Sequence, residues 1–479
     1  MGRVSGSSTV AVVGGGASGA LTAVHLLRRA RTCGTALEVA LIDQHGRHAT
    51  GQAYSTTDPH HLLNARADRM SALEDDPGHL LRWARENGLE ATGSDFLPRE
   101  AYGRYLRHVL ETAQAQASPG RRVTRVTGTV RALTQRGHDR PVRVRLADGR
   151  EIDADAVVLA TGNPATAARP PLADGAETRY VADPWAPGAL AGIGDGAAVL
   201  VMGTGLTMVD IAVTVTRAFP ETTVYAVSRR GLLPRRHRCP FPPPVDVPLA
   251  DGPLRLAGLL RDVRAAVRDN GGDWRGVVDG LRPRVPDLWA RLSVDDQRRF
   301  LNLAARYWEV HRHRIPPATA SRVAELRATG RLRVLRGQVS AAAPGPGGLA
   351  VRVGGEDAVG ELHVGWLVNG TGPASVTRDP FLARLFADGL ARPDPLRLGL
   401  DADAGGSVLD ASGRPNPRIF TLGPPLRGKR YETTAIPEIR AQAAALAPRL
   451  VEVIASGAPA PLERGDGRYP SAASRALLG

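Results

Sequence analysis

The stretch that decides the fold is "TVAVVGGGASGALTAVHLL", residues Thr9–Leu27. An apolar run of strand length leads into a glycine cluster, and a helix-like pattern of apolar residues follows. Gly14, Gly16 and Gly19 fill the G-x-G-x-x-G pattern of a dinucleotide-binding fold. The first glycine permits a tight turn, the second lets a pyrophosphate approach the backbone, and the third lets helix and strand pack closely. The N-terminus of the helix then faces the phosphates.

A second strand and a terminal acid complete this unit. The segment "ALEVALID", residues 36–43, is a strand pattern that ends in Asp43, where a carboxylate can bind ribose hydroxyls. Strand, glycines, helix, strand and acid occur in the order that a nucleotide site needs. This order favours a β-α-β nucleotide site over a glycine-rich surface turn.

The segment "AAVLVMGTGLTMVDIAVTV", residues 197–215, repeats the pattern. Gly203 and Gly205 take the first two glycine places, but Met208 stands at the third, which predicts looser packing of helix on strand. The next strand ends in Ser228–Arg230 instead of an acid. A hydroxyl and guanidinium groups suit a 2′-phosphate, which a carboxylate would repel. The second unit therefore predicts NADPH over NADH, with a solvated arginine pair as the alternative.

Length and composition are those of a multidomain globular protein. The chain has 479 residues, 43% of them hydrophobic and 23% charged. Its apolar runs fall far short of the ~20 residues needed to span a bilayer, and no secretory signal fits ahead of Thr9. Cys33 and Cys239 stand in unrelated contexts, which indicates neither a disulfide framework nor a zinc cluster. We expect a cytoplasmic protein that binds no membrane and no metal.

The net charge of +14 raises the question of nucleic acid. The excess is nearly all arginine, aromatic residues make up only 4%, and no basic run is interleaved with stacking side chains. We therefore expect no nucleic-acid binding, and an anionic small ligand is a better use for selected arginines.

Two nucleotide units in one chain predict that one cofactor reduces the other. The strand-end glycines in "ATG" (160–162) and "GTG" (370–372) are those that two-dinucleotide-binding flavoproteins use to link their domains. The expected fold is α/β, with two Rossmann-like domains. We expect the first glycine unit to bind FAD. This FAD domain is discontinuous, with a first part over 1–180 and a second part, which ends in the C-terminal helix, over 346–479. The NADPH domain, 181–345, is inserted between them and carries a helical insertion over about 250–328.

The chain resembles a bacterial family of uncharacterised FAD/NAD(P)-binding proteins over almost its full length. The resemblance is carried by these strings: "GQAYSTTDPHHLLNARADRMSAL" (51–73), "FLPREAYGRYL" (96–106), "GTGLTMVD" (203–210), "SRRGLLPRRH" (228–237), "WEVHRHRIPP" (308–317) and "YETTAIPEIRAQA" (431–443). More distantly, the arrangement is similar to single-chain monooxygenases with two Rossmann domains, including N-hydroxylases of amines and amino acids. The resemblance implies FAD and NADPH as cofactors and assigns no substrate.

The predicted cofactor contacts combine the glycine motifs with this resemblance. For FAD they are Gly14, Gly16, Ser18, Gly19, Asp43, Asn64, Thr161, Gly162, Gly423 and Thr434. For NADPH they are Gly203, Gly205, Thr207, Ser228, Arg229 and Arg230.

Near the C-terminus, many such flavoproteins place a Gly-Asp pair whose carboxylate binds the ribityl chain. This chain has Gly423-Pro424, so that contact must come from elsewhere or be absent. Thr434 shortly precedes Pro437 and Glu438, an arrangement that suits the first turn of a helix. In relatives such a helix directs its positive end at the flavin pyrimidine; the alternative is an ordinary capped helix.

Catalytic residues are not identified by any motif, and the candidates are few. Asn64 lies where related enzymes bring a loop close to the isoalloxazine ring; the alternative is an asparagine that closes a turn. His311 and His313 are two residues apart on a helix, which separates them and does not suit a metal. In a cleft they could bind an acidic substrate or a cofactor phosphate; otherwise they form a polar helix end. Arg99 and Tyr102 could face the same cleft, or simply pack on a helix surface.

Three functional hypotheses remain. The first, which we favour, is a monooxygenase, with N-hydroxylation as one form of its reaction. NADPH reduces FAD, O₂ adds at the flavin C4a position, and the peroxide transfers oxygen to a small-molecule substrate. The second is a flavin-dependent dehydrogenase or reductase without oxygen insertion. The third is a non-catalytic flavin-binding redox sensor or assembly module. No C-x-x-C motif is present, so a dithiol relay is not expected.

Overall fold

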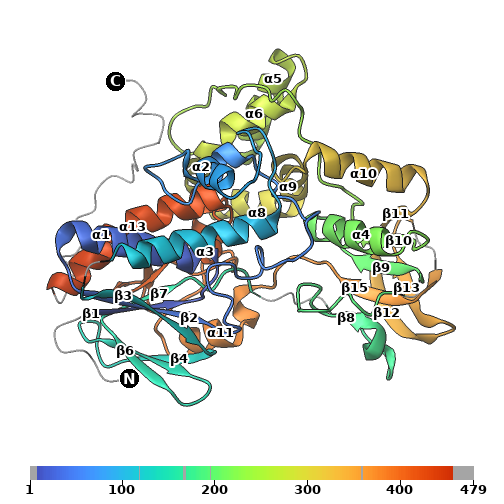
Figure 1. The fold of residues 1–479 in the computed structure, drawn as a ribbon. Helices are drawn as coiled ribbons and strands as arrows, with labels where there is room; N and C mark the ends of the chain where they lie inside the picture. The colour runs from blue at the N-terminus through green and yellow to red at the C-terminus, as the bar shows by residue number, and fades with distance from the viewer. Residues whose placement is uncertain (1–7, 118, 165–168, 195, 358–359, 457–479) are drawn as a thin grey trace.

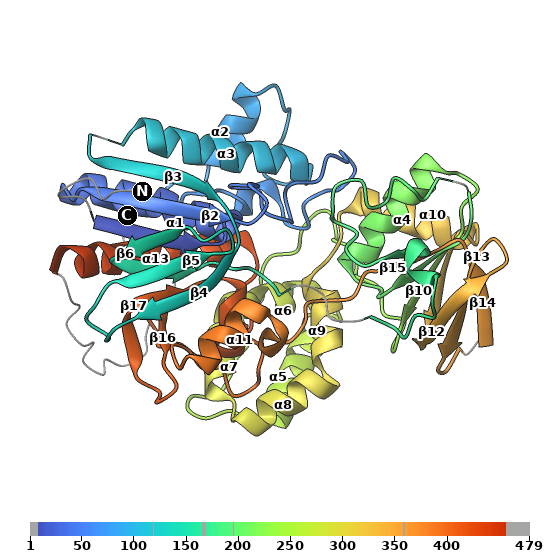
Figure 2. The ribbon, with the colours of Figure 1, turned by 90° about the horizontal axis from the view of Figure 1, so that it is seen from below.

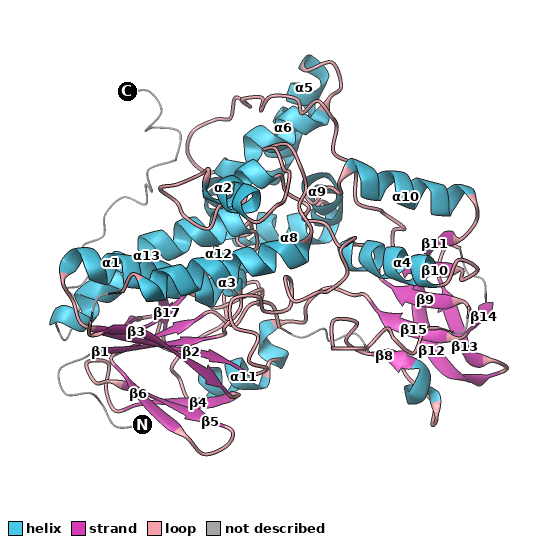
Figure 3. Ribbon diagram, viewed as in Figure 1, coloured by secondary structure: helices cyan, strands magenta, loops and turns pink. Residues whose placement is uncertain are grey.

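The computed structural model describes residues 8–117, 119–164, 169–194, 196–357 and 360–456 (Figure 1). Two lobes, each built on a parallel sheet, lie at opposite ends of the molecule, and a group of helices lies beside them (Figure 2). Helices cover one side of each parallel sheet (Figure 3). This is the α/β class with two nucleotide-binding-like lobes that the glycine units predict.

The first lobe has a six-stranded sheet in the order β16-β17-β7-β1-β2-β3. Its strands are β1 (Ser8–Val13), β2 (Leu37–Asp43), β3 (Arg121–Thr127), β7 (Ala156–Leu159), β16 (Ser407–Leu409) and β17 (Pro415–Thr421). All neighbours pair in parallel except β16 with β17. Because β17 joins β7, the end of the chain returns to the sheet that the start of the chain opens.

The apolar run of β1 is explained by burial on both faces. Val10 and Val12 pack in the core under the helices, which include α1 (Ala17–Cys33) and α13 (Ile436–Ser456). Ala11 and Val13 pack in a second core on the other face. A strand covered on both sides reads as continuous hydrophobic residues instead of alternating ones.

Smaller elements complete the first lobe. The helical face also holds α3, and the other face is covered by the antiparallel sheet β4-β5-β6 and α11. Two short helices, α2 and α12, belong to the same part of the molecule. The bounds of all these elements are α2 (His79–Glu86), α3 (Arg99–Ala115), β4 (Val130–Gln135), β5 (Val142–Leu146), β6 (Glu151–Ala154), α11 (Pro380–Ala387) and α12 (Arg427–Arg430).

The second lobe has a five-stranded parallel sheet in the order β11-β10-β9-β15-β8. One core joins it to α4 and α10, and another joins it to the antiparallel sheet β12-β13-β14. The bounds are β8 (Tyr180–Val181), β9 (Val199–Met202), α4 (Leu206–Ala218), β10 (Val224–Ser228), α10 (Pro317–Ala328), β11 (Leu332–Arg336), β12 (Gln338–Gly345), β13 (Gly348–Gly354), β14 (Gly360–Val364) and β15 (Trp366–Asn369).

The strand pairing moves one predicted boundary. The FAD domain is expected to resume at residue 346, but β13 pairs with β12 and β14, and β15 pairs with β9, so these three strands belong to the second lobe. The physical reason is that an apolar strand ending in glycine occurs in both lobes, and only long-range pairing decides which sheet receives it. The other expected boundaries stay predictions.

Between the lobes lies a helical group made of α5 (Leu256–Asp269), α6 (Trp274–Leu281), α7 (Val285–Arg291), α8 (Val294–Leu303) and α9 (Ala305–Arg312). We call it the insertion. It has its own core, which includes Tyr431 from the C-terminal part of the chain. The predicted helical stretch of about 250–328 contains these helices and also α10, which packs in the second lobe instead.

Within the described ranges, no helix has the length and apolar character to cross a membrane. The same residues contain no group of three or more His, Cys, Asp or Glu side chains able to hold a metal ion.

Candidate functional site

The first glycine loop turns between the ends of two strands. Gly14 has φ +108°, and a Cβ placed on it would lie 2.2 Å from the carbonyl oxygen of Ala160 at the end of β7. Its N–H donates to the carbonyl of Ile42 in β2, at 2.9 Å. Only glycine fits both the conformation and the space. Gly14 therefore makes the tight turn at the start of the loop, and its contact with FAD stays a prediction.

The loop then enters α1 with its backbone donors free. Gly16 is the N-cap of α1 and has no capping side chain, and no acidic residue stands in the first turn. The unsatisfied N–H groups of a helix start attract anions. A Cβ on Gly19 would lie 1.9 Å from the carbonyl oxygen of Gly14, which shows how closely the helix crosses the loop. Ser18 lies in this first turn, so the arrangement fits a pyrophosphate.

A second loop, which the sequence analysis did not single out, lies against the first. The N–H of Ala49 donates to the carbonyl of Gly15 at 2.7 Å. A Cβ on Gly16 would lie 3.3 Å from Cα of Gly51, whose own φ is +54°. The signal that could have revealed this loop is the glycine that opens "GQAYS". We call residues 44–51 the covering loop.

Asp43 lies beside the glycine loop, as predicted. One carboxylate oxygen, Oδ1, accepts the backbone N–H groups of His45 and Arg47, at 2.9 and 2.8 Å. A Cβ on Gly15 would lie 3.2 Å from the other oxygen, Oδ2. One oxygen therefore shapes the covering loop and the other faces the glycines, where it can bind a ribose hydroxyl.

The C-terminal part of the predicted FAD site lies against the start of α1. A Cβ on Gly423 would lie 2.8 Å from Oγ of Ser18. The carbonyl of Gly423 accepts the hydroxyl of Thr433 at 2.9 Å, and its N–H donates to Oε1 of Gln442 at 2.8 Å. Thr434, half-buried, precedes α13. Gly423 therefore lies close to the first turn of α1 and is hydrogen-bonded to residues before and within α13.

Three further features of the predicted FAD site can be located in the structure. Pro437 and Glu438 lie in the first turn of α13, as the sequence indicates. Thr161 and Gly162 directly follow Ala160, against which Gly14 packs. Pro424 occupies the place of the missing acid and begins a short 3-10 turn, so it supplies no carboxylate for a ribityl contact.

The second glycine loop has nearly the same backbone as the first. Gly203 has φ +107°, and a Cβ there would lie 2.5 Å from the carbonyl oxygen of Gly370, just after β15. Its N–H donates to Val227 in β10 at 2.7 Å. Gly205 is the N-cap of α4, again without a capping side chain or an acid in the first turn, where Thr207 lies. This loop therefore also fits a pyrophosphate.

Met208, at the place of the third glycine, is fully buried in the core of the second lobe. The sequence predicted looser packing of α4 on its strand because of this residue. That looser packing stays a prediction.

Three side chains, those of Ser228, Arg229 and Arg230, form the corner at the end of β10. The Ser228 hydroxyl is 2.8 Å from Oγ1 of Thr204 and accepts the N–H of Gly231 at 3.1 Å. Arg229 is exposed. Arg230 donates to the carbonyl of Asn302 at 2.9 Å and lies over the ring of Tyr307, so it reaches the insertion. The corner presents two guanidinium groups, while the serine hydroxyl mainly shapes the turn.

Asn64 and the two predicted histidines do not meet. The backbone carbonyl of Asn64 lies 3.0 Å from Nε2 of His237, a residue that the sequence analysis did not name. His311 contacts the carbonyl of Tyr307 at 2.6 Å. Burial and the Arg312 guanidinium lower the pKa of His313 to about 4. His311 lies in the last turn of α9, and His313 directly follows that helix.

Arg99 and Tyr102 also differ in role. Tyr102 is fully buried and donates to the carbonyl of Met70 at 2.9 Å, so it belongs to the core. Arg99 forms an ion pair with Asp210 of α4, in the other lobe. Trp185 lies 5.5 Å from the Arg99 guanidinium. This ion pair connects the lobes.

A second connection between the lobes lies beside it. The Thr214 hydroxyl donates to Asp58 at 2.5 Å and lies 2.8 Å from Nε2 of His61. Together with the Arg99–Asp210 pair, these contacts hold α4 against the first lobe. No local sequence pattern indicates them, because their partners are more than a hundred residues apart.

The insertion contacts the start of α13 through buried and half-buried charged side chains. Arg282 donates twice to Glu438, at 2.9 and 3.1 Å. Nε1 of Trp308 donates to Glu432 at 2.8 Å, and Arg312 lies 3.3 Å from the same carboxylate. The helix that is predicted to face the flavin is therefore positioned by the insertion.

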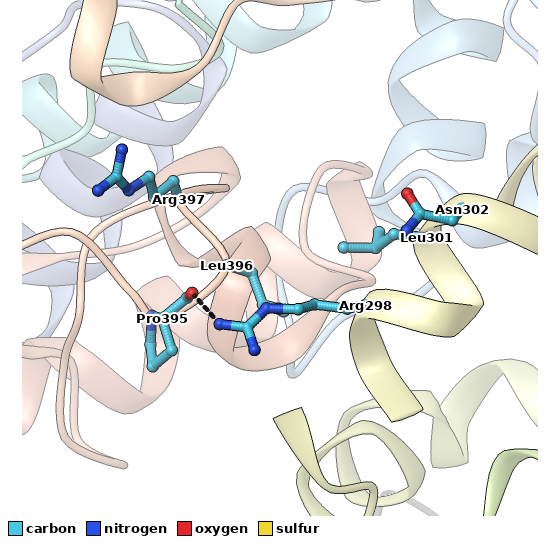
Figure 4. A pocket seen from close by; sticks show the side chains of 6 residues that line it. All are labelled: Arg298, Leu301, Asn302, Pro395, Leu396 and Arg397. Carbon is cyan, nitrogen blue, oxygen red and sulfur yellow. Dashed lines mark hydrogen bonds between the residues drawn. The ribbon is translucent and has the colours of Figure 1, made fainter. Parts of the chain in front are cut away.

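The insertion also borders an open cavity of about 370 Å³ (Figure 4). Arg298 crosses it and donates to the carbonyl of Pro395 at 3.5 Å. Its lining residues are Arg298, Leu301, Asn302, Pro395, Leu396 and Arg397. None of the predicted site residues lines this cavity.

Comparison with known proteins agrees with this geometry. Residues 11–164 match the family described as FAD-NAD(P)-binding. No curated protein matches the chain. The matched residues run from β1 to just beyond β7 and so contain the first glycine loop and Asp43.

Solved structures resemble the whole chain in fold. Ornithine hydroxylase of Pseudomonas aeruginosa is 15% identical, with a TM-score of 0.60, over 93% of this chain and 99% of that one. L-lysine 6-monooxygenase of Pseudomonas syringae is 16% identical, with a TM-score of 0.60, over 94% and 99%. The ornithine N-hydroxylase of Kutzneria sp. 744, solved with reduced FAD, NADP⁺ and L-ornithine, is 15% identical, with a TM-score of 0.57, over 93% and 99%. The fold is that of two-dinucleotide-domain flavoproteins, as the sequence analysis expected.

Proposed function

We propose that this protein is a FAD-dependent oxidoreductase reduced by NADPH, and that it acts as a monooxygenase on a small molecule with O₂. One observation carries the proposal: the chain contains two glycine loops of the same geometry, with φ +108° at Gly14 and +107° at Gly203. Each loop is backed by a carbonyl at the end of a neighbouring parallel strand. Two such sites in one chain suit a bound flavin and a second nucleotide that reduces it.

The residues divide between the two nucleotides. The glycine loop at Gly14, the start of α1 and Asp43 would hold the FAD pyrophosphate and ribose. The loop at Gly203, the start of α4 and the arginine corner would hold NADPH, because Arg229 and Arg230 bring positive charge where a 2′-phosphate lies. FAD, when bound, supplies hydride acceptance and O₂ activation, and the protein orients both nucleotides and limits access of water.

The cysteines support direct use of the flavin. Cys33 and Cys239 are both free and exposed, and they belong to α1 and to the segment after β10. No disulfide therefore stands ready to relay electrons from flavin to a protein substrate. This favours a small-molecule reaction at the flavin over a dithiol reductase.

N-hydroxylation is the finer form of the proposal. It is supported by likeness of fold to hydroxylases of ornithine and lysine, together with an insertion that holds the helix predicted to face the flavin. A reductase without oxygen insertion has the same two nucleotide sites, so the reaction with O₂ decides between them. A flavin-binding sensor would bind FAD without turning over NADPH.

The test uses the full chain loaded with FAD. Under anaerobic conditions NADPH should bleach the flavin absorbance faster than NADH does. After air is admitted, a panel of amines, amino acids and aromatic acids should contain a compound that raises NADPH and O₂ consumption and gains one oxygen atom by mass. Flavin bleaching followed by transfer to a dye, with no oxygenated product across the panel, would identify a reductase instead.

A further inference from the structure

A buried polar cluster lies where three segments of the chain meet. His237, in the segment after β10, is 7% exposed and contacts the Asn64 carbonyl from the first lobe. Its backbone N–H donates to the carbonyl of Ile315 at 3.0 Å, just beyond α9. His237 therefore connects the Asn64 loop, which the resemblance places near the flavin ring, with the end of the insertion.

The tautomer of His237 follows from its neighbours. A carbonyl oxygen only accepts hydrogen bonds, so Nε2, at 3.0 Å from the Asn64 oxygen, carries the hydrogen. Burial, together with the Arg314 guanidinium, lowers the pKa of His237 to about 4, which keeps the ring neutral at pH 7. Nδ1 is then a hydrogen-bond acceptor, and it is buried without a partner among the described residues.

Two arginines beside it have unused donors. Arg312 is 8% exposed and Arg314 is 5% exposed. Nε of each makes no hydrogen bond within the described part of the chain, and neither does Nη2 of Arg312. Arg314 is ion-paired with Asp279, and Arg312 lies 3.3 Å from Glu432 and 3.6 Å from Glu438. Their charges are therefore compensated, while several N–H groups are left over.

Such leftover groups are costly. A buried donor or acceptor without a partner destabilises the folded protein, and most proteins leave only a few such groups per hundred residues. Nδ1 of His237 is one such acceptor, and Nε of Arg312 and Nε of Arg314 are two such donors. After burial, the charged groups that lower the pKa of His237 are the guanidinium groups of Arg314, Arg66 and Arg312. An anion that also carries a donor would satisfy the whole group.

Aromatic side chains border the same cluster. The ring of Phe96 lies 4.9 Å from that of His237, and the ring of Phe241 lies 5.9 Å from it. The Arg66 guanidinium lies 4.5 Å above Phe241. These contacts place two aromatic rings beside the ring of His237.

We propose that Arg312, Arg314 and His237 form the polar end of a binding site for a small aromatic carboxylate that also bears an N–H or O–H group. The arginine N–H groups donate to the carboxylate, Nδ1 of His237 accepts from the N–H or O–H group, and Phe96 and Phe241 contact the ring. The inference rests on the proposed function in one respect: the ligand of this site is the substrate class of the flavin enzyme. Arg312 lies 3.6 Å from Glu438 in the first turn of α13, which places the site beside the predicted flavin end of that helix.

The first experiment measures binding alone, without NADPH. The FAD-loaded wild-type protein is titrated by calorimetry with benzoate, with benzamide as its uncharged counterpart, and with the three aminobenzoate isomers. Benzoate should bind at least tenfold more tightly than benzamide, and at least one aminobenzoate should bind more tightly than benzoate. Equal binding of benzoate and benzamide, or binding of neither, overturns the proposal.

The second experiment tests the residues. Arg314→Lys keeps a positive charge opposite Asp279 but removes Nε–H, so benzoate binding should weaken about tenfold. His237→Phe keeps an aromatic ring but removes Nδ1, so the advantage of the best aminobenzoate over benzoate should disappear. The matched control is Arg264→Lys, an exposed arginine of α5, which should bind all probes as the wild type does. Unchanged benzoate affinity in Arg314→Lys contradicts the proposal.

Folding and function can be separated in both experiments. Retained FAD and an unchanged melting temperature show that a variant has folded, and the benzoate–benzamide comparison in the wild type needs no variant at all. Binding is measured in the absence of turnover. If NADPH fails to reduce the flavin but benzoate binds selectively, the enzyme proposal fails and the carboxylate site stands. If NADPH reduces the flavin but benzoate binds no more tightly than benzamide, the carboxylate site is refuted and the enzyme proposal stands.

Discussion

The two glycine loops of this protein share a backbone and differ in what surrounds them. In the first, the covering loop contacts the glycines: the carbonyl of Gly15 accepts the N–H of Ala49, and Gly51 lies next to Gly16. In the second, no described atom lies within 4 Å of the position where Gly205 would carry a Cβ. The backbone turn is therefore the same in both glycine loops. The first loop is covered by a second loop, whereas the second is open.

This difference fits two nucleotides with different residence times. A cofactor that stays bound through many turnovers gains from a loop that closes its site, since release requires the loop to move. A coenzyme that leaves after each hydride transfer needs open access. We infer that the first loop holds FAD as a resident group and the second binds NADPH as an exchanging one.

The largest effect should come from replacing the first glycine of each loop by alanine. Gly14→Ala places a Cβ 2.2 Å from the Ala160 carbonyl oxygen in a conformation that alanine rarely adopts, so bound FAD should be lost. Gly203→Ala makes the equivalent clash with Gly370. It should leave FAD bound and abolish reduction by NADPH. The flavin content and the anaerobic bleaching rate of the two purified variants measure this.

The matched pair is its own control, because both changes strain the same kind of turn. Circular dichroism checks that each variant has folded. Loss of FAD from Gly203→Ala, with FAD retained in Gly14→Ala, would reverse the assignment of the two sites.

The next effect concerns the choice of coenzyme. Replacement of both Arg229 and Arg230 by serine should raise the KM for NADPH about tenfold and leave that for NADH nearly unchanged, since one or two charge-assisted contacts to the 2′-phosphate are worth ~1.4 kcal/mol or more. Arg217→Ser, an exposed arginine in the last turn of α4, is the control and should change neither value. A proportional rise in both KM values would show that the arginines do not bind the 2′-phosphate.

A smaller effect should follow from loosening the contact between the lobes. Arg99→Gln leaves the Asp210 carboxylate without its partner, so the second lobe should sample other orientations. The rate of flavin reduction by NADPH should fall about fivefold, or ~1 kcal/mol in the barrier, with FAD content unchanged. Stopped-flow mixing measures this rate, and exposed Arg104→Gln on α3 is the control. If Arg99→Gln and the control reduce equally fast, the ion pair does not set the lobe arrangement for hydride transfer.

The smallest effect should be a dependence of stability on pH. The pKa of His237 is lowered from 6.5 to about 4, so the unfolded chain binds more protons than the folded one between these values. Lowering the pH from 7 to 5 should therefore reduce the free energy of unfolding. His237→Phe should reduce that loss by ~1–2 kcal/mol, as thermal unfolding at the two pH values measures. An identical pH dependence in wild type and variant would show that His237 is not buried neutral.

Local patterns predicted the tight turns of the two glycine loops, because the residues that form each turn lie close together in the sequence. Gly14 and Gly203 stand directly after apolar strands, and Asp43 ends the next one, so spacing alone places them. The covering loop was missed because only its contact with Gly16 gives Gly51 a role.

Long-range features escaped the sequence for a physical reason. Arg99 meets Asp210 across 111 positions, and His237 meets Asn64 across 173. Neither pair has a local signature. The boundary at residue 346 failed in the same way, because only sheet pairing assigns β15 to the second lobe.

The central claim is that electrons pass from a nucleotide in the open loop to a flavin in the covered one. The most direct measurement is anaerobic stopped-flow mixing of the FAD-loaded wild-type protein with NADPH, followed through the flavin absorbance. The account predicts complete bleaching in the wild type and none in Gly203→Ala, although dithionite bleaches both. A wild-type flavin that stays oxidised with NADPH but bleaches with dithionite would contradict the account.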